Sequence, residues 1–254
     1  MAGGHAHALY LHGDTTLHRA APQVKIGAAF GLVLAIVATP REAVWAFIVY
    51  ATLIIAAGAT AGITPTFAGR RLLVEIPFLL VALFLPLLGG GDIVTVAGID
   101  LSVAGLWDAW NILAKATLGL GVAIVLGATT QVTQLLSGLD GLRVPSIVTG
   151  IAGFMVRYID VIAEDWSRMR VAMASRGHDP RWITQLGPYA RMLGVMFVRT
   201  YERGERVYLA MAARGYSGSM PISLQPPTPT IQWVGAGTML TLTWLVTATA
   251  WMTR

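Results

Sequence analysis

Long apolar runs alternate with polar segments along this chain, and five of the runs have the character of transmembrane helices. They cover residues 24–38, 43–61, 72–88, 109–136 and 231–252. A helix needs about 20 mainly apolar residues to cross a bilayer, so we predict five spans, the first of which requires tilting or local thinning. That short run would also suit a signal-peptide core, but the second run follows almost at once and favours two helices joined by a turn at 40–42.

The segment 89–108, between the third and fourth runs, is acidic. It contains Asp92, Asp100 and Asp108 but neither lysine nor arginine. Apolar and polar residues alternate on either side of Gly98, which predicts a small β-hairpin. We expect this segment to form an external loop.

Basic residues set the predicted orientation of the spans, because lysine and arginine gather on the cytoplasmic side of a membrane. Eleven of the eighteen basic residues lie in the segment 137–229. They are Arg143, Arg157, Arg168, Arg170, Arg176, Arg181, Arg191, Arg199, Arg203, Arg206 and Arg214. We therefore predict that 137–229 is a cytoplasmic domain and that residues 1–23 form a cytoplasmic tail. Only Arg41, Lys115 and Arg254 oppose this arrangement.

The segment 137–229 is expected to fold into two long helices, at about 145–176 and 188–214. The second is amphipathic, with apolar residues recurring at spacings of three and four. The stretch 146–163 is apolar enough to suggest a sixth span, but Arg157 and Asp160 interrupt it, and charges inside a bilayer are costly. We interpret this helix as lying along or beneath the membrane. The predicted fold is an all-α polytopic membrane protein with about five transmembrane helices, two long cytoplasmic helices and a small hairpin.

These two helices carry the same motif twice. The first copy has Glu164, Arg168 and then Ala172-Met173-Ala174-Ser175-Arg176-Gly177; thirty-eight residues later come Glu202, Arg206 and Ala210-Met211-Ala212-Ala213-Arg214-Gly215. Glutamate four residues before arginine places both on one helix face as an ion pair. Glycine suits the left-handed position just after a helix end. The repeat therefore predicts two helices, each with an arginine at its C-terminal tip.

The two arginine tips have a structural and a functional interpretation. An arginine near a helix C-terminus interacts favourably with the helix dipole, by roughly 0.3–1 kcal/mol. Capping does not require methionine or two alanines, however, and these are repeated as well. Small residues beside a projecting guanidinium allow a partner to approach and to make a directional contact with a carboxylate. Two copies would suit a cytoplasmic partner with two equivalent sockets.

Composition narrows the remaining functions. The chain is 55% hydrophobic, only 12% charged and free of cysteine, which is typical of a membrane protein and excludes thiolate metal sites. It has no phosphate-binding loop and no zinc-protease motif. Acidic residues are interleaved with the arginines of 137–229, so a nucleic-acid surface is not expected. His5 and His7 could form a weak metal site, but a solvated tail is the simpler interpretation.

In these features the chain resembles the transmembrane T component of energy-coupling factor (ECF) transporters, a branch of the ABC importers, and especially its cobalt-type CbiQ members. The resemblance rests on Arg176-Gly177 and Arg214-Gly215 in their alanine-rich settings. A lead-in adds to it, Leu142-Arg143-Val144-Pro145 followed by Phe154-Met155-Val156-Arg157-Tyr158. It is close over 137–221 and loose over the apolar N-terminal half.

The resemblance implies a non-enzymatic subunit of the inner (cytoplasmic) cell membrane, without cofactor, catalytic residues or metal site. Its implied partners are two cytoplasmic ATP-binding cassette ATPase subunits and a separate integral-membrane substrate-binding subunit. The implied coupling residues are Ala174, Ser175, Arg176, Gly177, Ala212, Ala213, Arg214 and Gly215. The ion pairs Glu164–Arg168 and Glu202–Arg206 would stiffen the helices, and the apolar helix faces would pack on one another and on the membrane partner. The implied cargo is cobalt, with nickel or a vitamin as alternatives.

Two other classes of function are weighed against this interpretation. A polytopic membrane enzyme could use His178-Asp179 or Glu164-Asp165 near lipid headgroups, although only one copy of the repeat has these residues. A self-sufficient secondary transporter would need polar or broken helices at the bilayer midplane. The predicted spans offer only threonines, Gln131 and Gln134 as notable polar groups.

Overall fold

The computed structural model describes residues 10–88, 90, 93–96, 99–178, 187–216 and 228–253, and these fall into two compact units. We call them the bundle, which includes residues up to Leu139 and the C-terminal helix, and the two-helix unit, which begins at Asp140. The boundary falls inside helix α7 (Val132–Gly141).

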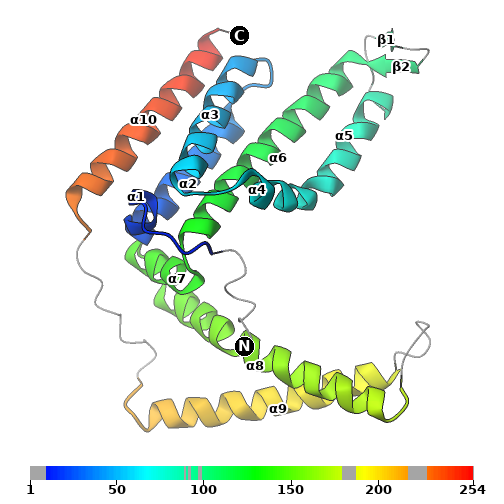
Figure 1. Cartoon of the computed structure of the whole chain (residues 1–254), viewed down its shortest axis with the longest axis vertical. Coiled ribbons are helices and arrows are strands. Elements are labelled where there is room, and N and C mark those ends of the chain that lie inside the picture. Colours follow the sequence, from blue (N-terminus) through cyan, green and yellow to red (C-terminus); the bar gives the residue numbers. More distant parts are fainter. Residues whose placement is uncertain are drawn as a thin grey trace. The chain divides into compact units, whose positions relative to one another are not determined.

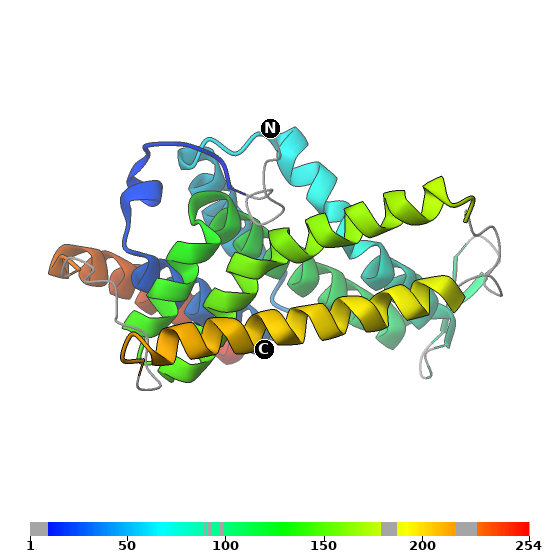
Figure 2. The same ribbon diagram turned by 90° about the horizontal axis from the view of Figure 1, so that it is seen from below.

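The bundle contains most of the elements of the fold (Figure 1). In chain order they are α1 (Thr16–Arg19), α2 (Pro22–Ala38), α3 (Val44–Thr60), α4 (Pro65–Leu72), the 3-10 turn η2 (Leu73–Glu75), α5 (Ile76–Leu88), β1 (Ile93–Val96), β2 (Ile99–Ser102), α6 (Val103–Thr129), α7 (Val132–Gly141) and α10 (Thr230–Met252). The two-helix unit contains α8 (Ser146–Ser175) and α9 (Gly187–Ala212), seen as two long, continuous helices in Figure 2.

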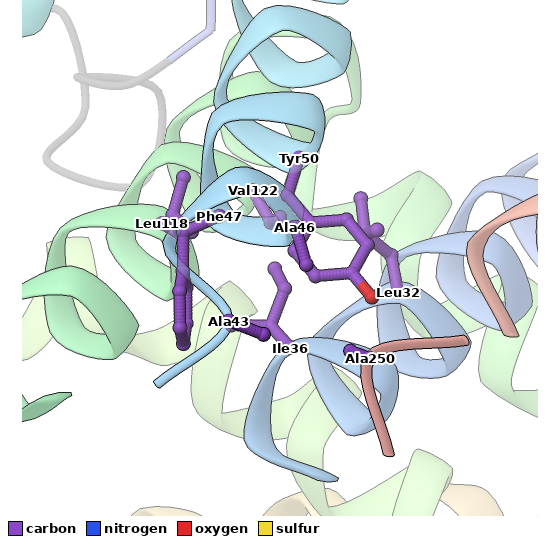
Figure 3. Close-up of a cluster of buried hydrophobic side chains, with 9 residues drawn as sticks. All are labelled: Leu32, Ile36, Ala43, Ala46, Phe47, Tyr50, Leu118, Val122 and Ala250. Atoms are coloured by element: carbon purple, nitrogen blue, oxygen red, sulfur yellow. The ribbon is translucent and has the colours of Figure 1, made fainter. Parts of the chain in front are cut away.

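The core of the bundle lies where α2, α3, α6 and α10 meet (Figure 3). Ile36, Ala46 and Tyr50 are almost completely buried there. The Tyr50 hydroxyl lies 2.8 Å from Thr247 Oγ1 and 3.2 Å from Thr39 Oγ1. A polar group inside a membrane bundle must find its hydrogen bonds within the protein. This hydroxyl cluster therefore ties α3 to both α2 and α10.

The run predicted as one helix over 109–136 is two helices, α6 and α7, so that prediction was wrong. The backbone of Thr130 is extended (φ −140°, ψ 125°) between them. Lys25 Nζ donates to Thr129 O (2.9 Å) and to Thr130 Oγ1 (3.2 Å), which satisfies groups that the helix leaves free at this break. Gln134 Oε1 then accepts from Gln131 N at 3.1 Å, as in half of a capping box, and α7 begins.

The predicted β-hairpin is confirmed, but the loop around it is shorter than expected. Strands β1 and β2 are antiparallel and pair Val96 with Ile99 and Ile93 with Ser102. Ser102 Oγ then accepts from Gly105 N at 3.2 Å, which caps α6. Residues 103–108, assigned to the loop 89–108 by sequence, are therefore helical.

Three helical segments of the described chain are long and apolar enough to cross a membrane: Pro65–Leu88, Val103–Thr129 and Ser146–Ser175. Helices α2 and α3 are apolar but have only 17 residues each. α10 has 23 residues and coincides with the predicted last span at 231–252. The first of the long segments is α4, η2 and α5 in succession, so the predicted helix at 72–88 begins earlier and contains a tighter turn.

Because Ser146–Ser175 is among the three, our interpretation that α8 lies along the membrane stays a prediction.

Gly105 provides a test of the packing between α5 and α6. A Cβ atom there would lie 2.5 Å from Leu85 O and 2.8 Å from Pro86 Cα, and backbone atoms cannot move aside as a side chain can. We expect Gly105→Ala to lower the midpoint of thermal unfolding in detergent by about 3–10 °C. Gly119→Ala is the matched control, because a Cβ at Gly119 of the same helix has no such neighbour within 4 Å. Equal midpoints for the two variants would contradict the close approach.

Candidate functional site: two Arg-Gly helix ends

Both copies of the repeat end a helix in the same way. α8 ends at Ser175 and α9 ends at Ala212, within two residues of the predicted ends. Gly177 (φ 76°) and Gly215 (φ 84°) both adopt the left-handed conformation, as the sequence predicts. No neighbouring atom lies within 4 Å of a Cβ built at either glycine. Glycine is therefore favoured here by the backbone angle and not by lack of space.

The hydrogen bonds at the two ends are equivalent residue by residue. Gly177 N donates to Ala174 O (2.9 Å), and the next amide, of His178, donates to Met173 O (3.1 Å). In the second copy, Gly215 N donates to Ala212 O (3.0 Å) and Tyr216 N donates to Met211 O (3.0 Å). This pair of bonds is the Schellman motif, which satisfies the last carbonyls of a helix. The tips are therefore closed by the backbone, without help from the arginine side chains.

The two arginines are presented alike. Arg176 and Arg214 are exposed, as are the three other predicted coupling residues of each copy. These are Ala174, Ser175 and Gly177 in the first copy and Ala212, Ala213 and Gly215 in the second. Within the described residues neither arginine side chain makes a hydrogen bond or an ion pair. Both guanidinium groups are thus available to a partner.

The predicted ion pairs within each helix are present. Glu164 pairs with Arg168, and Glu202 Oε2 lies 3.9 Å from Arg206 Nη1. All four side chains are more than half exposed. Exposed pairs of this kind contribute little to stability, so any stiffening of the helices by them is small.

A contact that the sequence analysis missed fixes the crossing of α8 and α9. Arg203 Nη2 lies 3.1 Å from Asp165 Oδ2, and both side chains are about one-third exposed. Nearby, the rings of Trp166 and Tyr189 lie 6.1 Å apart, and the rings of His178 and Tyr189 lie 5.8 Å apart. Asp165 and Arg203 are separated by 38 residues, which is the offset of the repeat. Opposite charges at equivalent repeat positions were the signal that could have revealed the pair.

The apolar faces of the two helices do not pack on one another along their length. No residue of α8 is buried, and among the described residues of α9 only Met192 is. On α8, Ile147, Ile151, Met155 and Ile159 recur every fourth residue and are each more than half exposed. The expectation that these faces cover each other was wrong, because the helices meet only around their crossing. We call this row of four residues the α8 stripe.

Of the two alternative catalytic pairs, only Glu164-Asp165 lies wholly within the described residues. Glu164 and Asp165 each pair with a different arginine, Arg168 and Arg203 respectively, so they do not act as a free carboxylate pair. Asp179 and the N-terminal histidines His5 and His7 lie outside the described residues. Within the described part of the chain, no group of three or more histidine, cysteine, aspartate or glutamate residues could hold a metal ion.

Comparison with known families identifies the group to which these features belong. The profile of the CbiQ family, described as cobalt transport protein, matches residues 13–225. The chain belongs to the CbiQ family. The matched region includes both Arg-Gly ends and four of the five predicted spans.

Individual relatives agree with the family assignment. The energy-coupling factor transporter transmembrane protein EcfT of Bacillus selenitireducens is 26% identical over 228 residues, with 82% of each chain covered. The cobalt transport protein CbiQ of Rhodobacter capsulatus is 30% identical over 128 residues, 49% of this chain and 51% of that protein. A putative fused cobalt transport protein CbiMQ of Methanocorpusculum labreanum is 26% identical over 178 residues, 67% of this chain. The chain spans about half of that CbiQ protein and 30% of the fused protein.

These relatives and the apolar helices together identify a multi-pass membrane protein related to the T components of ECF transporters. The EcfT relative is named as a transmembrane protein of an energy-coupling factor transporter, and the CbiQ relative as a cobalt transport protein. This assignment agrees with the large apolar side chains that the bundle exposes on α3 and α5, such as Ile48, Ile55, Leu83 and Phe84.

The ion pair between Asp165 and Arg203 provides a test of the contact between α8 and α9. We expect Arg203→Gln to destabilise the contact between α8 and α9 by roughly 1–2 kcal/mol, because Asp165 would lose a partly buried charged partner. The readout is the rate of limited proteolysis within residues 140–216 of the full-length protein. Arg168→Gln is the matched control, since its pair with Glu164 is exposed.

The reversed pair Asp165→Arg/Arg203→Asp should restore the proteolysis rate of the original protein. If Arg203→Gln and Arg168→Gln were equally resistant, the crossing would not depend on this ion pair.

Proposed function

We propose that this chain is the energy-coupling transmembrane subunit of an ECF-type importer, and that Arg176 and Arg214 dock into two ATPase subunits. The observation that carries the proposal is the identical presentation of the two arginines. Each arginine is exposed and follows a helix that ends in small residues. The next residue is a glycine in the left-handed backbone conformation. Two equivalent helix tips suit two equivalent binding sites, which a pair of ATPase subunits would provide.

The chemistry of the tips supports a docking role. Guanidinium is planar and offers five N–H donors, so it can bind a carboxylate of a partner through two parallel hydrogen bonds. Ala174 and Ala212 add little bulk beside it, and the chain leaves the helix direction at Gly177 and Gly215. A partner surface can therefore approach each guanidinium closely. The expected sockets are acidic grooves on the ATPase subunits.

The long helices would carry motion from the tips toward the membrane. α8 has 30 residues and α9 has 26, which correspond to about 45 and 39 Å. Joined at Asp165 and Arg203, they would move as a crossed pair when the ATPase subunits close or open. The exposed α8 stripe offers an apolar surface to the integral-membrane substrate-binding subunit. In this scheme the chain itself catalyses no reaction and holds no cofactor.

Cobalt is the proposed cargo, because the family is described as cobalt transport protein and a relative carries that name. Nickel or a vitamin is the alternative, since the EcfT relatives are not named for a metal. The cargo would be bound by the substrate-binding subunit. In the proposed topology the bundle lies in the inner membrane of the cell. The N-terminus and both Arg-Gly tips are cytoplasmic.

Charge reversal at the tips tests the docking role. The full-length chain is co-expressed with the ATPase subunits of its transporter and purified from membranes, and the retained ATPase is quantified. We expect Arg176→Glu and Arg214→Glu each to reduce the retained ATPase, and the double variant to reduce it at least tenfold. The physical reason is that a glutamate at the tip would repel the acidic socket.

The matched control is the double variant Arg170→Glu/Arg199→Glu. It makes the same change in charge, with one exposed arginine on each helix, but leaves both tips intact. We expect it to retain the ATPase and the transport activity. If the tip variant fractionates into membranes normally and keeps its ATPase, the arginines do not bind the ATPase subunits and the coupling proposal fails.

A further inference from the structure

No proline accounts for the break between α6 and α7. The residues from Val103 to Gly141 include none, although proline is a common cause of a sharp change in helix direction. The backbone of Thr130 is nevertheless extended, and α7 turns away from the axis of α6 (Figure 1). Ala128, Thr129 and Thr130 are all buried. Their contacts with the rest of the fold show what keeps the helix broken.

The last carbonyls of α6 are bound by the N-terminal part of the chain. In an uninterrupted α-helix each carbonyl accepts from the amide four residues later, so those of Ala128 and Thr129 would accept from two amides of α7. Here Ala128 O accepts instead from Leu11 N, at 2.9 Å. Thr129 O accepts from Lys25 Nζ, also at 2.9 Å. Leu11 and Lys25 thus replace two hydrogen bonds that would continue α6 into α7.

The ammonium group of Lys25 is the centre of these contacts. Its side chain is buried, and it donates to Thr129 O, to Thr130 Oγ1 at 3.2 Å and to His18 O at 3.1 Å. An ammonium group has three N–H donors, so all of them are used, and each acceptor is a neutral oxygen. Burial of a charge is costly unless it is paired. The balance between this bound form and a released form is therefore finer than for a buried ion pair.

Hydrogen bonds of His18 hold the N-terminal segment together. His18 Nε2 lies 3.0 Å from Leu11 O, and because a carbonyl oxygen can only accept, this nitrogen carries the proton. His18 Nδ1 lies 2.8 Å from Thr15 Oγ1. Through these bonds Leu11, Thr15, His18 and Lys25 form one connected segment. We call residues 11–25 the latch.

Helix α7 contacts the latch at one place and α8 at another. A Cβ atom at Gly138 would lie 2.9 Å from the backbone carbon of Pro22 and 2.8 Å from Ile26 Cδ1, so α7 packs closely on the start of α2. Near the other end of α7, Thr149 Oγ1 of α8 lies 3.4 Å from Asp140 Oδ1. A change in the direction of α7 would therefore displace α8.

We infer that α6 and α7 have two alternative conformations, broken and continuous, and that the latch holds the broken one and opens during the transport cycle. When Leu11 and Lys25 leave the two carbonyls, amides of α7 take their place and the helix becomes continuous. The inference rests on the proposed coupling role, in which α8 and α9 move with the ATPase subunits. Lys25 is then a positioning residue, which acts through the direction of α7.

Spin labels test the latch, because the chain contains no cysteine of its own. Ala104 of α6 is exposed and Ser137 of α7 is partly exposed, so each is replaced by cysteine and labelled. Double electron–electron resonance then measures the distance between them. A continuous helix would place the two positions about 50 Å apart, since 33 residues separate them (137 − 104). The broken form gives a shorter distance. In the complex with the ATPase subunits, we expect ATP with vanadate to shift the distance toward the longer value.

Two variants release the latch without any partner. Lys25→Met should raise the population at the longer distance at least fivefold, because the carbonyl of Thr129 becomes free for an amide of α7. Thr130→Val removes one acceptor and keeps the β-branched shape, so it should have a smaller effect in the same direction and should fold even if Lys25→Met does not. Lys115→Met is the matched control. It removes the other lysine, which donates to Val37 O, and should keep the original distances.

A disulfide tests whether opening belongs to the cycle. Leu11 N and Ala128 O are in contact, so Leu11→Cys/Ala128→Cys places two cysteines side by side. We expect the oxidised variant to retain its ATPase subunits but to hydrolyse ATP at least fivefold more slowly, with recovery on reduction by dithiothreitol. Loss of stability cannot explain this result, because the cross-link strengthens the contact. Each single cysteine variant should be insensitive to dithiothreitol.

Three results would overturn the inference. The first is an unchanged distance distribution in both Lys25→Met and Thr130→Val. The second is the same distribution with and without ATP and vanadate while the ATPase subunits are bound. The third is full ATP hydrolysis by the oxidised disulfide variant. Failure of the coupling role has a different signature, since Arg176→Glu/Arg214→Glu would then keep its ATPase, whereas the response to Lys25→Met is measured on the full-length chain alone.

Discussion

Polar groups in the bundle must be satisfied by the protein itself, because lipid offers them no hydrogen bonds. Two of the cations near its spans illustrate this constraint. Lys115 Nζ donates to Val37 O at 2.8 Å, at the end of α2, and Arg41 pairs with Glu42 and Asp108 in the adjoining turn. The hydrogen bonds with Glu42 and then Asp108 raise the pKa of Arg41 above its usual value. Lys115 and Arg41, whose charges oppose the predicted orientation, therefore both make contacts within the fold.

The two-helix unit differs from the bundle in how few of its described residues are buried. Helices α8 and α9 have almost no buried residues, and they meet chiefly around Asp165, Arg203 and Tyr189. Such an arrangement leaves long apolar faces uncovered, including the α8 stripe. Burial of apolar area is the main source of stability in proteins, so these faces require a membrane or a partner. A subunit that works inside a larger complex has this property, which agrees with the proposed role.

How well the sequence predicts each feature depends on how local its cause is. The ends of α8 and α9 were predictable because Gly177 and Gly215 impose the turn through their own backbone. The break at Thr130 was not, because it is stabilised by Lys25, which lies 105 residues away in the chain. The start of α6 was missed for another reason. Ser102 is a favourable helix cap, but the acidic surroundings were interpreted as a loop.

The crossing of α8 and α9 shows what the repeat itself contributes. The two copies agree at the ion pairs and at the tips but differ at Asp165 and Arg203, which meet at the crossing. Two aspartates or two arginines at this point would repel each other, so the opposite charges of Asp165 and Arg203 favour the crossing.

Equivalent positions at the crossing also make the two arms equal. Arg176 follows Asp165 by eleven residues (176 − 165), and Arg214 follows Arg203 by eleven (214 − 203). Each arm is therefore about 16 Å long. In the proposed coupling role, the 38-residue offset between Asp165 and Arg203 therefore gives both tips the same separation from the crossing.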